Sequence, residues 1–125
     1  MQFSSRQFAD IYVAAPIGRI DHSAASPLEQ SLAPLLAQSS AGKTGLVLDF
    51  AGVDYISSVG LRILMIAAKE MRARGARIAV AGLQPVVAEI FAISRFDRVL
   101  EVFPSVRDAV ATFSAPALAA FDAAR

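Results

Sequence analysis

Two adjacent serines, Ser57 and Ser58, are the residues of this sequence best suited to chemistry. They lie in the stretch DYISSVGLRIL, residues 54–64, where a strand-like run gives way to a helix-like run. A serine in such a place can cap the helix, act as a catalytic nucleophile, or accept a phosphate from a kinase. The rest of the sequence has to distinguish these three roles.

Serine catalysis is disfavoured because the sequence offers little to activate a hydroxyl. The only histidine is His22, in a loop far upstream, and it reads as a polar loop residue. The G-x-S-x-G elbow of many hydrolases is absent, since Tyr55 and Ile56 stand where its first glycine would be. We therefore expect the chain not to be an enzyme.

Cofactor and metal sites are not expected either. Gly42-Lys43-Thr44 resembles the end of a Walker A loop, but Ala37 stands in place of the required glycine, and the order of helix and strand around it is reversed. The aspartates are scattered singly, and there is no cysteine and no second histidine to complete a ligand set. The sequence predicts no cofactor.

A phosphate at the serines is physically reasonable. A phosphoserine adds about −1.5 to −2 charges and three acceptor oxygens, and a helix N-terminus offers free N–H groups and the positive end of its dipole. Arg62, one turn after Ser58, is the nearest cation in sequence. From the residues alone a plain cap is the more common role, and a switch remains open.

Length and composition predict a cytoplasmic, single-domain protein. The chain has 125 residues, 55% of them hydrophobic, and a formal net charge of +1. That balance gives no electrostatic reason to expect nucleic acid or an anionic membrane as a partner. No apolar run approaches the roughly 20 residues of a membrane helix, and the N-terminus lacks the pattern of a signal peptide.

Hydrophobic periodicity predicts an α/β fold in which helices cover a sheet. Strands are expected at residues 3–8, 11–17, 45–50, 76–82 and 99–103. Helices are expected from a cap at Ser26, from the two serines to a stop at Gly75, over residues 85–94, and from Ser105. In the third helix Val86, Ile90 and Ile93 share one side. The Ala-rich segment after Ser114 either extends the last helix or frays.

Several separated motifs together resemble one family. LVLDFAGVDYISSVGLRIL, with GRIDH upstream and VAGLQPVVAEIFAISRFDRVLEVF downstream, is similar to the STAS domain, and within it to the bacterial anti-sigma factor antagonists. The resemblance covers residues 11–113. It implies a single STAS domain over residues 1–125, with a small mixed β-sheet and helices packed on it. The Ala-rich residues 114–125, beyond the matched segment, are expected to form a helical extension or tail.

The resemblance also implies a mechanism. Unphosphorylated antagonists of this family bind an anti-sigma factor that is itself a serine kinase of the histidine-kinase-like ATPase class, which frees the sigma factor. The kinase then phosphorylates a serine at the start of the second helix and the complex breaks. A PP2C-type phosphatase restores the unphosphorylated form.

The family's phosphorylation motif is Asp-Ser-Ser/Thr-Gly-Leu. Aligned on Gly60 and Leu61, the acceptor falls on Ser58, while Ser57 replaces the acid and is a minor candidate site. Asp21, in GRID, matches a family acid that contacts the kinase; a turn-forming or capping role is equally compatible with it. The resemblance thus implies a partner-binding set, namely Asp21, Ser57, Ser58, Val59, Gly60 and Arg62.

The family offers two alternatives to sigma-factor control. Some partner-switching antagonists regulate other outputs. STAS domains also serve as regulatory parts of anion transporters or as small subunits of lipid-transport ABC systems, where they bind constitutively. The retained serine favours the antagonist.

Overall fold

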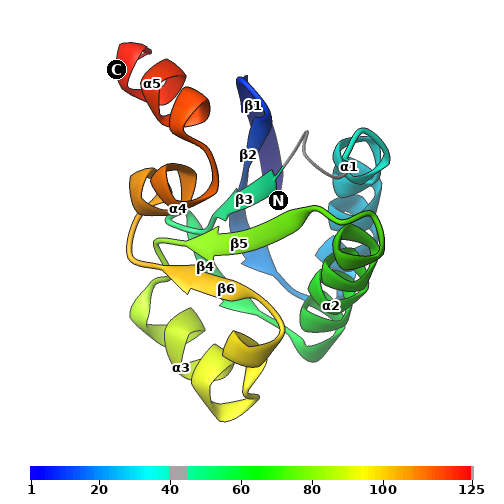
Figure 1. Cartoon of the computed structure of the whole chain (residues 1–125). Helices are drawn as coiled ribbons and strands as arrows, with labels where there is room; N and C mark the ends of the chain where they lie inside the picture. The colour runs from blue at the N-terminus through cyan, green and yellow to red at the C-terminus, as the bar shows by residue number, and fades with distance from the viewer. Residues whose placement is uncertain (40–44, 125) are drawn as a thin grey trace.

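The computed structural model describes residues 1–39 and 45–124, so Gly42-Lys43-Thr44 lies outside the described residues. The described part contains a six-stranded mixed sheet, which confirms the α/β class (Figure 1). Its strands are β1 (Gln2–Phe8), β2 (Ile11–Ile20), β3 (Gly45–Asp49), β4 (Val53–Ile56), β5 (Arg77–Ala81) and β6 (Glu101–Phe103). The main order is β1-β2-β3-β5-β6, in which only β1 runs antiparallel to its neighbour.

Helices cover both faces of the sheet. They are α1 (Ala25–Ala37), α2 (Ser58–Ala73), α3 (Pro85–Ile93), α4 (Val106–Phe113) and α5 (Ala115–Ala123), with short 3-10 turns η1 (His22–Ala24) and η2 (Phe96–Arg98). α1 and α2 lie on one side of the sheet and α4 and α5 on the other (Figure 1). Successive strand residues point to opposite faces of the sheet. Leu46 and Leu48 therefore pack in the core that contains buried residues of α1 and α2, while Val47 packs in the core that contains buried residues of α4 and α5. Among the described residues, no helix is long and apolar enough to cross a membrane.

Strand β2 changes its partner along its length, and this positions the serines. Residues 11–14 of β2 pair with β3, whereas its end pairs with β4, with Ile20 opposite Ile56. The chain therefore leaves β2 at Asp21 and leaves β4 at Ser57 side by side. The backbone N–H of Ser57 donates to the carbonyl of Ile20 at 2.8 Å.

One strand was not predicted, and one local prediction is wrong. Strand β4 was not expected, because it has only four residues and one of them is Asp54, an unfavourable strand residue. The first helix does not begin at a Ser26 cap. Asp21 caps the 3-10 turn η1, which runs directly into α1 at Ala25, so Ser26 already lies inside the first turn.

The C-terminal segment forms its own helix. Ser114 has an extended backbone, φ −161° and ψ 120°, which ends α4, and its hydroxyl accepts from the N–H of Ala117 to begin α5. The ring of Phe121 packs edge-on against Phe8 at 5.2 Å between centroids, so α5 is held against β1. Residues 115–123 therefore form a separate helix and neither extend α4 nor fray.

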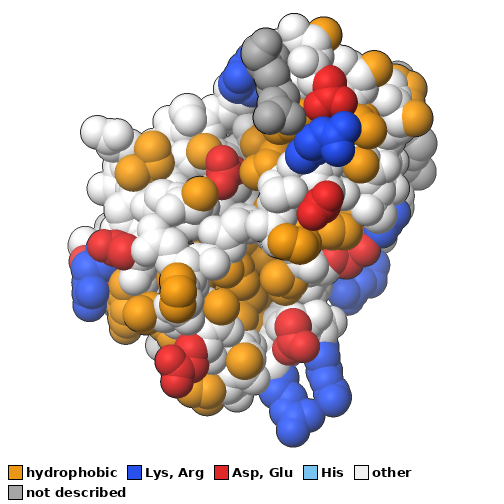
Figure 2. All heavy atoms as spheres, turned by 90° about the vertical axis from the view of Figure 1, so that its left-hand side faces the viewer, with side chains coloured by type: hydrophobic (Ala, Val, Ile, Leu, Met, Phe, Trp, Pro, Cys, Tyr) orange, Lys and Arg blue, Asp and Glu red, His pale blue; other side chains and the backbone are white. Residues whose placement is uncertain are grey.

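Helix α3 presents part of its apolar surface to solvent. Its buried residues are Val87 and Phe91, whereas Val86 and Ile93 are 55% and 77% exposed. Of the predicted side of Val86, Ile90 and Ile93, Ile90 is partly buried against the core, while Val86 and Ile93 face solvent. The face carrying α3, α4 and α5 shows hydrophobic side chains over its lower half (Figure 2).

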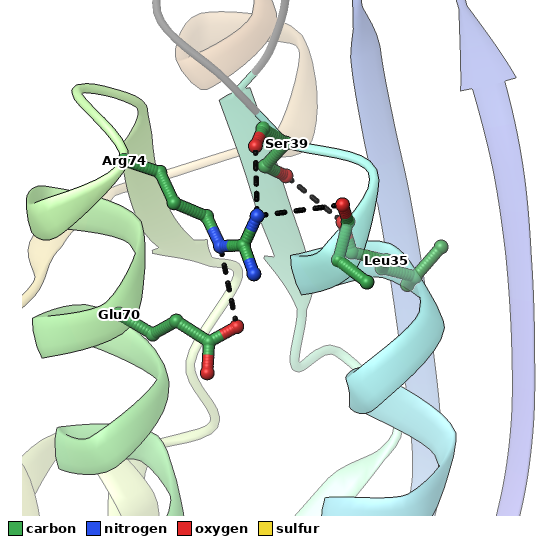
Figure 3. Close-up of polar contacts among 5 residues, drawn as sticks. Leu35, Ser39, Glu70 and Arg74 are labelled. Atoms are coloured by element: carbon green, nitrogen blue, oxygen red, sulfur yellow. Dashed lines mark hydrogen bonds and ion pairs between the residues drawn. The ribbon is translucent and has the colours of Figure 1, made fainter.

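The C-terminal ends of α1 and α2 are tied together by Arg74. Its Nη1 donates to the carbonyls of Ala37 at 3.4 Å and Ser39 at 3.5 Å, and its Nε pairs with Glu70 at 3.4 Å (Figure 3). A guanidinium at the carboxyl end of α1 satisfies carbonyls that have no helical partner and complements the helix dipole. This contact anchors α2 at the end opposite to the serines.

Candidate functional site

The two serines have different structural roles. Ser57 is the residue before α2, with an extended backbone at φ −83° and ψ 168°, and its Oγ accepts from the N–H of Gly60 at 3.2 Å. The hydroxyl of Ser57 is therefore used as the cap of α2, the role that the sequence left open for either serine.

Ser58 is the first residue of α2 and its side chain is exposed. Within residues 1–39 and 45–124 its hydroxyl makes no hydrogen bond, and the backbone N–H groups of Ser58 and Val59 are also without partners. These donors, with the positive end of the dipole of α2, favour an anion at this point. Ser58 is thus the serine whose hydroxyl is free to react.

Ser57→Ala is expected to lower the free energy of unfolding by about 1 kcal/mol, because the N–H of Gly60 loses its acceptor. Thermal unfolding followed by circular dichroism should show a fall of about 4 °C. Ser58→Ala, the matched change one residue on, should shift the midpoint by less than about 2 °C. A larger loss for Ser58→Ala than for Ser57→Ala would contradict the assignment of the cap.

Asp21 lies beside the serines and caps the turn that precedes α1. Its Oδ1 accepts from the N–H of Ser23 at 3.0 Å, the hydroxyl of Ser23 at 2.7 Å and the N–H of Ala24 at 3.1 Å. These bonds, above all the one from the Ser23 hydroxyl, lower the pKa of Asp21, and the charge of Arg19 acts in the same direction. The capping role weighed for Asp21 is confirmed.

Asp21→Ala is expected to lower the melting temperature at pH 7 and to have less effect in acid. Because the pKa of Asp21 is lower in the folded chain than in the unfolded one, its contribution is complete above about pH 4 and is lost as the pH falls through the folded pKa. As the pH is lowered from 7 through the folded pKa, the melting curves of the variant should therefore converge with those of the parent. Asp54→Ala, an exposed acid of β4, is the control; a difference for Asp21→Ala that stayed constant with pH would contradict this account.

The other predicted partner-binding residues lie in the first and second turns of α2. Val59 is half-buried and Arg62 is exposed, without an ion pair in the described part of the chain. Gly60 is buried, and a Cβ built on it would lie 2.8 Å from Cγ2 of Ile20 and 2.8 Å from Cγ1 of Ile56. Gly60 therefore permits a close approach between α2 and the β2–β4 pair.

The site also contains an arginine–tyrosine pair that the sequence analysis missed. Arg19 and Tyr55 are directly opposite in the β2–β4 pairing, and Cζ of Arg19 lies 3.9 Å from the centroid of the Tyr55 ring. Both residues lie in motifs that the sequence analysis noted, Arg19 in GRID and Tyr55 in DYISS. Their pairing could not be predicted because strand β4 was not predicted.

The arrangement lacks the contacts of a serine hydrolase. His22 is exposed in η1, and among residues 1–39 and 45–124 no hydrogen bond joins it to either serine. The hydroxyl of Ser58 therefore has no base within hydrogen-bonding reach in the described structure.

Comparisons with known proteins agree on one family. Residues 2–109 match the STAS domain. The chain is 40% identical over 85 residues to the "Putative anti-sigma factor antagonist BtrV" of Bordetella bronchiseptica, an alignment that covers 68% of this chain and 73% of that protein.

Two solved structures share the fold at low identity. The Thermotoga maritima protein TM1081 has a TM-score of 0.80 and 16% identity, covering 89% of this chain and 93% of that one. The unphosphorylated form of the anti-sigma factor antagonist SpoIIAA, known from Bacillus, has a TM-score of 0.72 and 17% identity, covering 89% of this chain and 95% of that one. A phosphorylated form of SpoIIAA aligns with a TM-score of 0.67.

Proposed function

Since the chain belongs to the STAS domain family, and within it to the anti-sigma factor antagonists, we propose that it is a partner-switching protein controlled by phosphorylation of Ser58. In its unphosphorylated form it binds an anti-sigma factor and so releases a sigma factor. The anti-sigma factor is also the serine kinase, of the histidine-kinase-like ATPase class, and a PP2C-type phosphatase reverses the modification. The chain itself needs no catalytic group or cofactor for this role.

The observation that supports Ser58 as the phosphorylated residue is that the two serine hydroxyls have different surroundings. The Ser57 hydroxyl is engaged with the N–H of Gly60, while the Ser58 hydroxyl is exposed and makes no hydrogen bond within the described chain. A kinase must reach the hydroxyl that it modifies, and the Ser57 hydroxyl is engaged in capping α2. Ser58 can be modified without disturbing that bond.

The expected effect of the phosphate is on the surface and not on the fold. Free N–H groups at the start of α2 can donate hydrogen bonds to the phosphate oxygens, so the domain stays folded. A partner that packs against a neutral hydroxyl would instead have to desolvate a dianion, which costs several kcal/mol unless a cation meets it. Phosphorylation therefore favours dissociation.

Peptide mass spectrometry tests the proposal. The protein is purified from its own cells and cleaved after Lys43 and Arg62, which gives one peptide holding both serines. Backbone fragments between Ser57 and Ser58 then locate any phosphate. Phosphate on Ser58 would support the switch as proposed, and phosphate on Ser57 would keep the mechanism but refute the alignment on Gly60 and Leu61.

The absence of phosphate under every growth condition would remove the switch. The chain would then be a constitutive binding module, and the transporter-subunit alternative would gain weight. Co-purification separates the two cases, since a kinase and a phosphatase accompany an antagonist, whereas a permease and an ATPase accompany a transport subunit.

A further inference from the structure

Arg19 is a preorganised cation at the edge of the candidate site. Its guanidinium lies over the Tyr55 ring at 3.9 Å from Cζ to the centroid. Such a stack fixes the plane of the guanidinium, which limits the side-chain entropy lost when its N–H groups bind an anion. The next pair along these strands, Ile20 and Ile56, is buried in the core, so Arg19 and Tyr55 point outward.

Arg19 has no carboxylate partner within the described residues. The nearest acid in sequence is Asp21, whose charge interaction with Arg19 lowers the pKa of Asp21. No ion pair within 4.0 Å joins the two, and the Oδ1 of Asp21 is already engaged by Ser23 and Ala24. The hydrogen-bonding edge of Arg19 thus faces solvent.

The same chain contains a completed version of this arrangement. Arg77 lies over the ring of Phe113, with Cζ 4.4 Å from the centroid. Its Nε and Nη2 donate to the two carboxylate oxygens of Glu101 at 3.1 and 2.6 Å. An arginine stacked on a ring therefore keeps an edge that binds a carboxylate through two bonds. Arg19 has the stack and lacks the carboxylate.

The position of Arg19 connects it to the proposed switch. Arg19 precedes Ile20, whose carbonyl accepts from the N–H of Ser57 at 2.8 Å, and Tyr55 lies two residues before Ser57. Arg19 therefore lies on the strand pair whose ends lead directly into Asp21 and the start of α2. Arginine and tyrosine are also among the residue types that most often dominate the energy of protein interfaces.

We propose that Arg19, held on Tyr55, binds a carboxylate of the anti-sigma factor partner, and that this ion pair helps the partner distinguish the two states of Ser58. The inference rests on the proposed function. A phosphate on Ser58 adds negative charge to the surface that the partner's carboxylate approaches, and so opposes its pairing with Arg19. The partner surface that fits this site accordingly carries an Asp or Glu opposite Arg19.

Binding measurements with purified proteins test this. The probe is the histidine-kinase-like ATPase protein of the same cells that phosphorylates Ser58 in vitro, used without ATP. Arg19→Glu should raise the dissociation constant of the complex with this kinase by about 30-fold or more. Arg6→Glu is the matched control, since Arg6 also lies over a ring, that of Phe8. Arg6 is opposite Val13 on β2, about 20 Å along the strand from Arg19, and its change should alter affinity less than about threefold.

Two conservative variants separate charge from geometry. Tyr55→Phe keeps the ring and should bind within about threefold of the parent. Arg19→Lys keeps the charge but loses the paired donors, and should weaken binding by about tenfold. Changing each exposed acid of the kinase to lysine should reveal one position that restores binding to Arg19→Glu.

The outcomes separate this inference from the function beneath it. If the parent binds the kinase and Arg19→Glu binds equally well, the inference is overturned and the proposed function stands. If Arg19→Glu weakens binding but no acid-to-lysine change in the kinase restores it, the carboxylate assignment is overturned. If no such kinase binds or phosphorylates the parent chain, the proposed function fails and the inference fails with it.

Discussion

Ser58→Glu is expected to remain folded and to weaken binding of the anti-sigma factor kinase by about 100-fold or more. The substitution places a charge at the exposed first residue of α2, where the helix dipole tolerates an anion. At an interface the same charge is desolvated without a partner, which costs about 2–5 kcal/mol. The thermal midpoint should stay within about 2 °C of the parent while the affinity falls.

Ser58→Ala is expected to give the opposite behaviour. It removes the acceptor oxygen but keeps a neutral surface, so the variant should bind the kinase about as tightly as the parent. In the presence of ATP the parent should dissociate as it is modified, whereas Ser58→Ala should stay bound.

Titration calorimetry gives the affinities for this pair of variants, and gel filtration with and without ATP gives the release. Ser5→Glu is a suitable control, because Ser5 is exposed on β1, away from α2. If Ser58→Ala still dissociated in ATP, the modified residue would lie elsewhere. If Ser5→Glu weakened binding as much as Ser58→Glu, the loss would reflect net charge and not position.

Much of the fold could be predicted from sequence because most elements carry strong local signals. Leu28, Leu32, Leu35 and Leu36 recur at helical spacing and are all buried. Proline at the start of α3 and glycine after α2 mark their ends within a residue or two. The buried strands are short apolar runs, and these too were found.

The failures occur where tertiary contacts override local pattern. In α3 two sets of apolar residues have equivalent spacing, Val86 with Ile90 and Val87 with Phe91. Periodicity cannot choose between them, and the Phe91 ring settles the matter by packing edge-on against Phe50 and Phe96 at 6.3 and 5.2 Å. Strand β4 depends on the second half of β2, a pairing that a four-residue run cannot reveal.

The sequence predicted where the candidate site lies in the chain but not how its side chains are arranged. Sequence identified both serines, yet a helix start is uncertain by a residue or two. Whether Ser57 or Ser58 caps α2 was therefore undecidable, and the hydrogen bond to Gly60 decides it. The Arg19–Tyr55 pair stayed hidden because it joins residues 36 positions apart across a strand pair that was not expected.

Substituting Gly60 is expected to be the most damaging small change near the site. A Cβ there would meet Ile20 and Ile56 at 2.8 Å, and both side chains are buried and cannot move into solvent. Glycine to alanine inside a helix ordinarily gains about 0.5–1 kcal/mol, but overpacking costs about 1–3 kcal/mol. Gly60→Ala should therefore lose about 1–2 kcal/mol, and Gly60→Val, which adds two more methyl groups, about 3 kcal/mol or more.

Urea unfolding curves measure these losses, and a double-mutant cycle identifies their cause. Ile56→Ala removes the Cγ1 atom that the new Cβ would strike, so its destabilisation and that of Gly60→Ala should sum to more than the loss in the double variant. Gly52→Ala is the control, since its Cβ would approach only Ile17 at 3.1 Å, a side chain 46% exposed and able to move. If the two losses were strictly additive, the destabilisation by Gly60→Ala would not arise from a clash with the Ile56 side chain. The close approach of α2 to β2 and β4, which holds Ser58 beside Asp21, would then need another explanation.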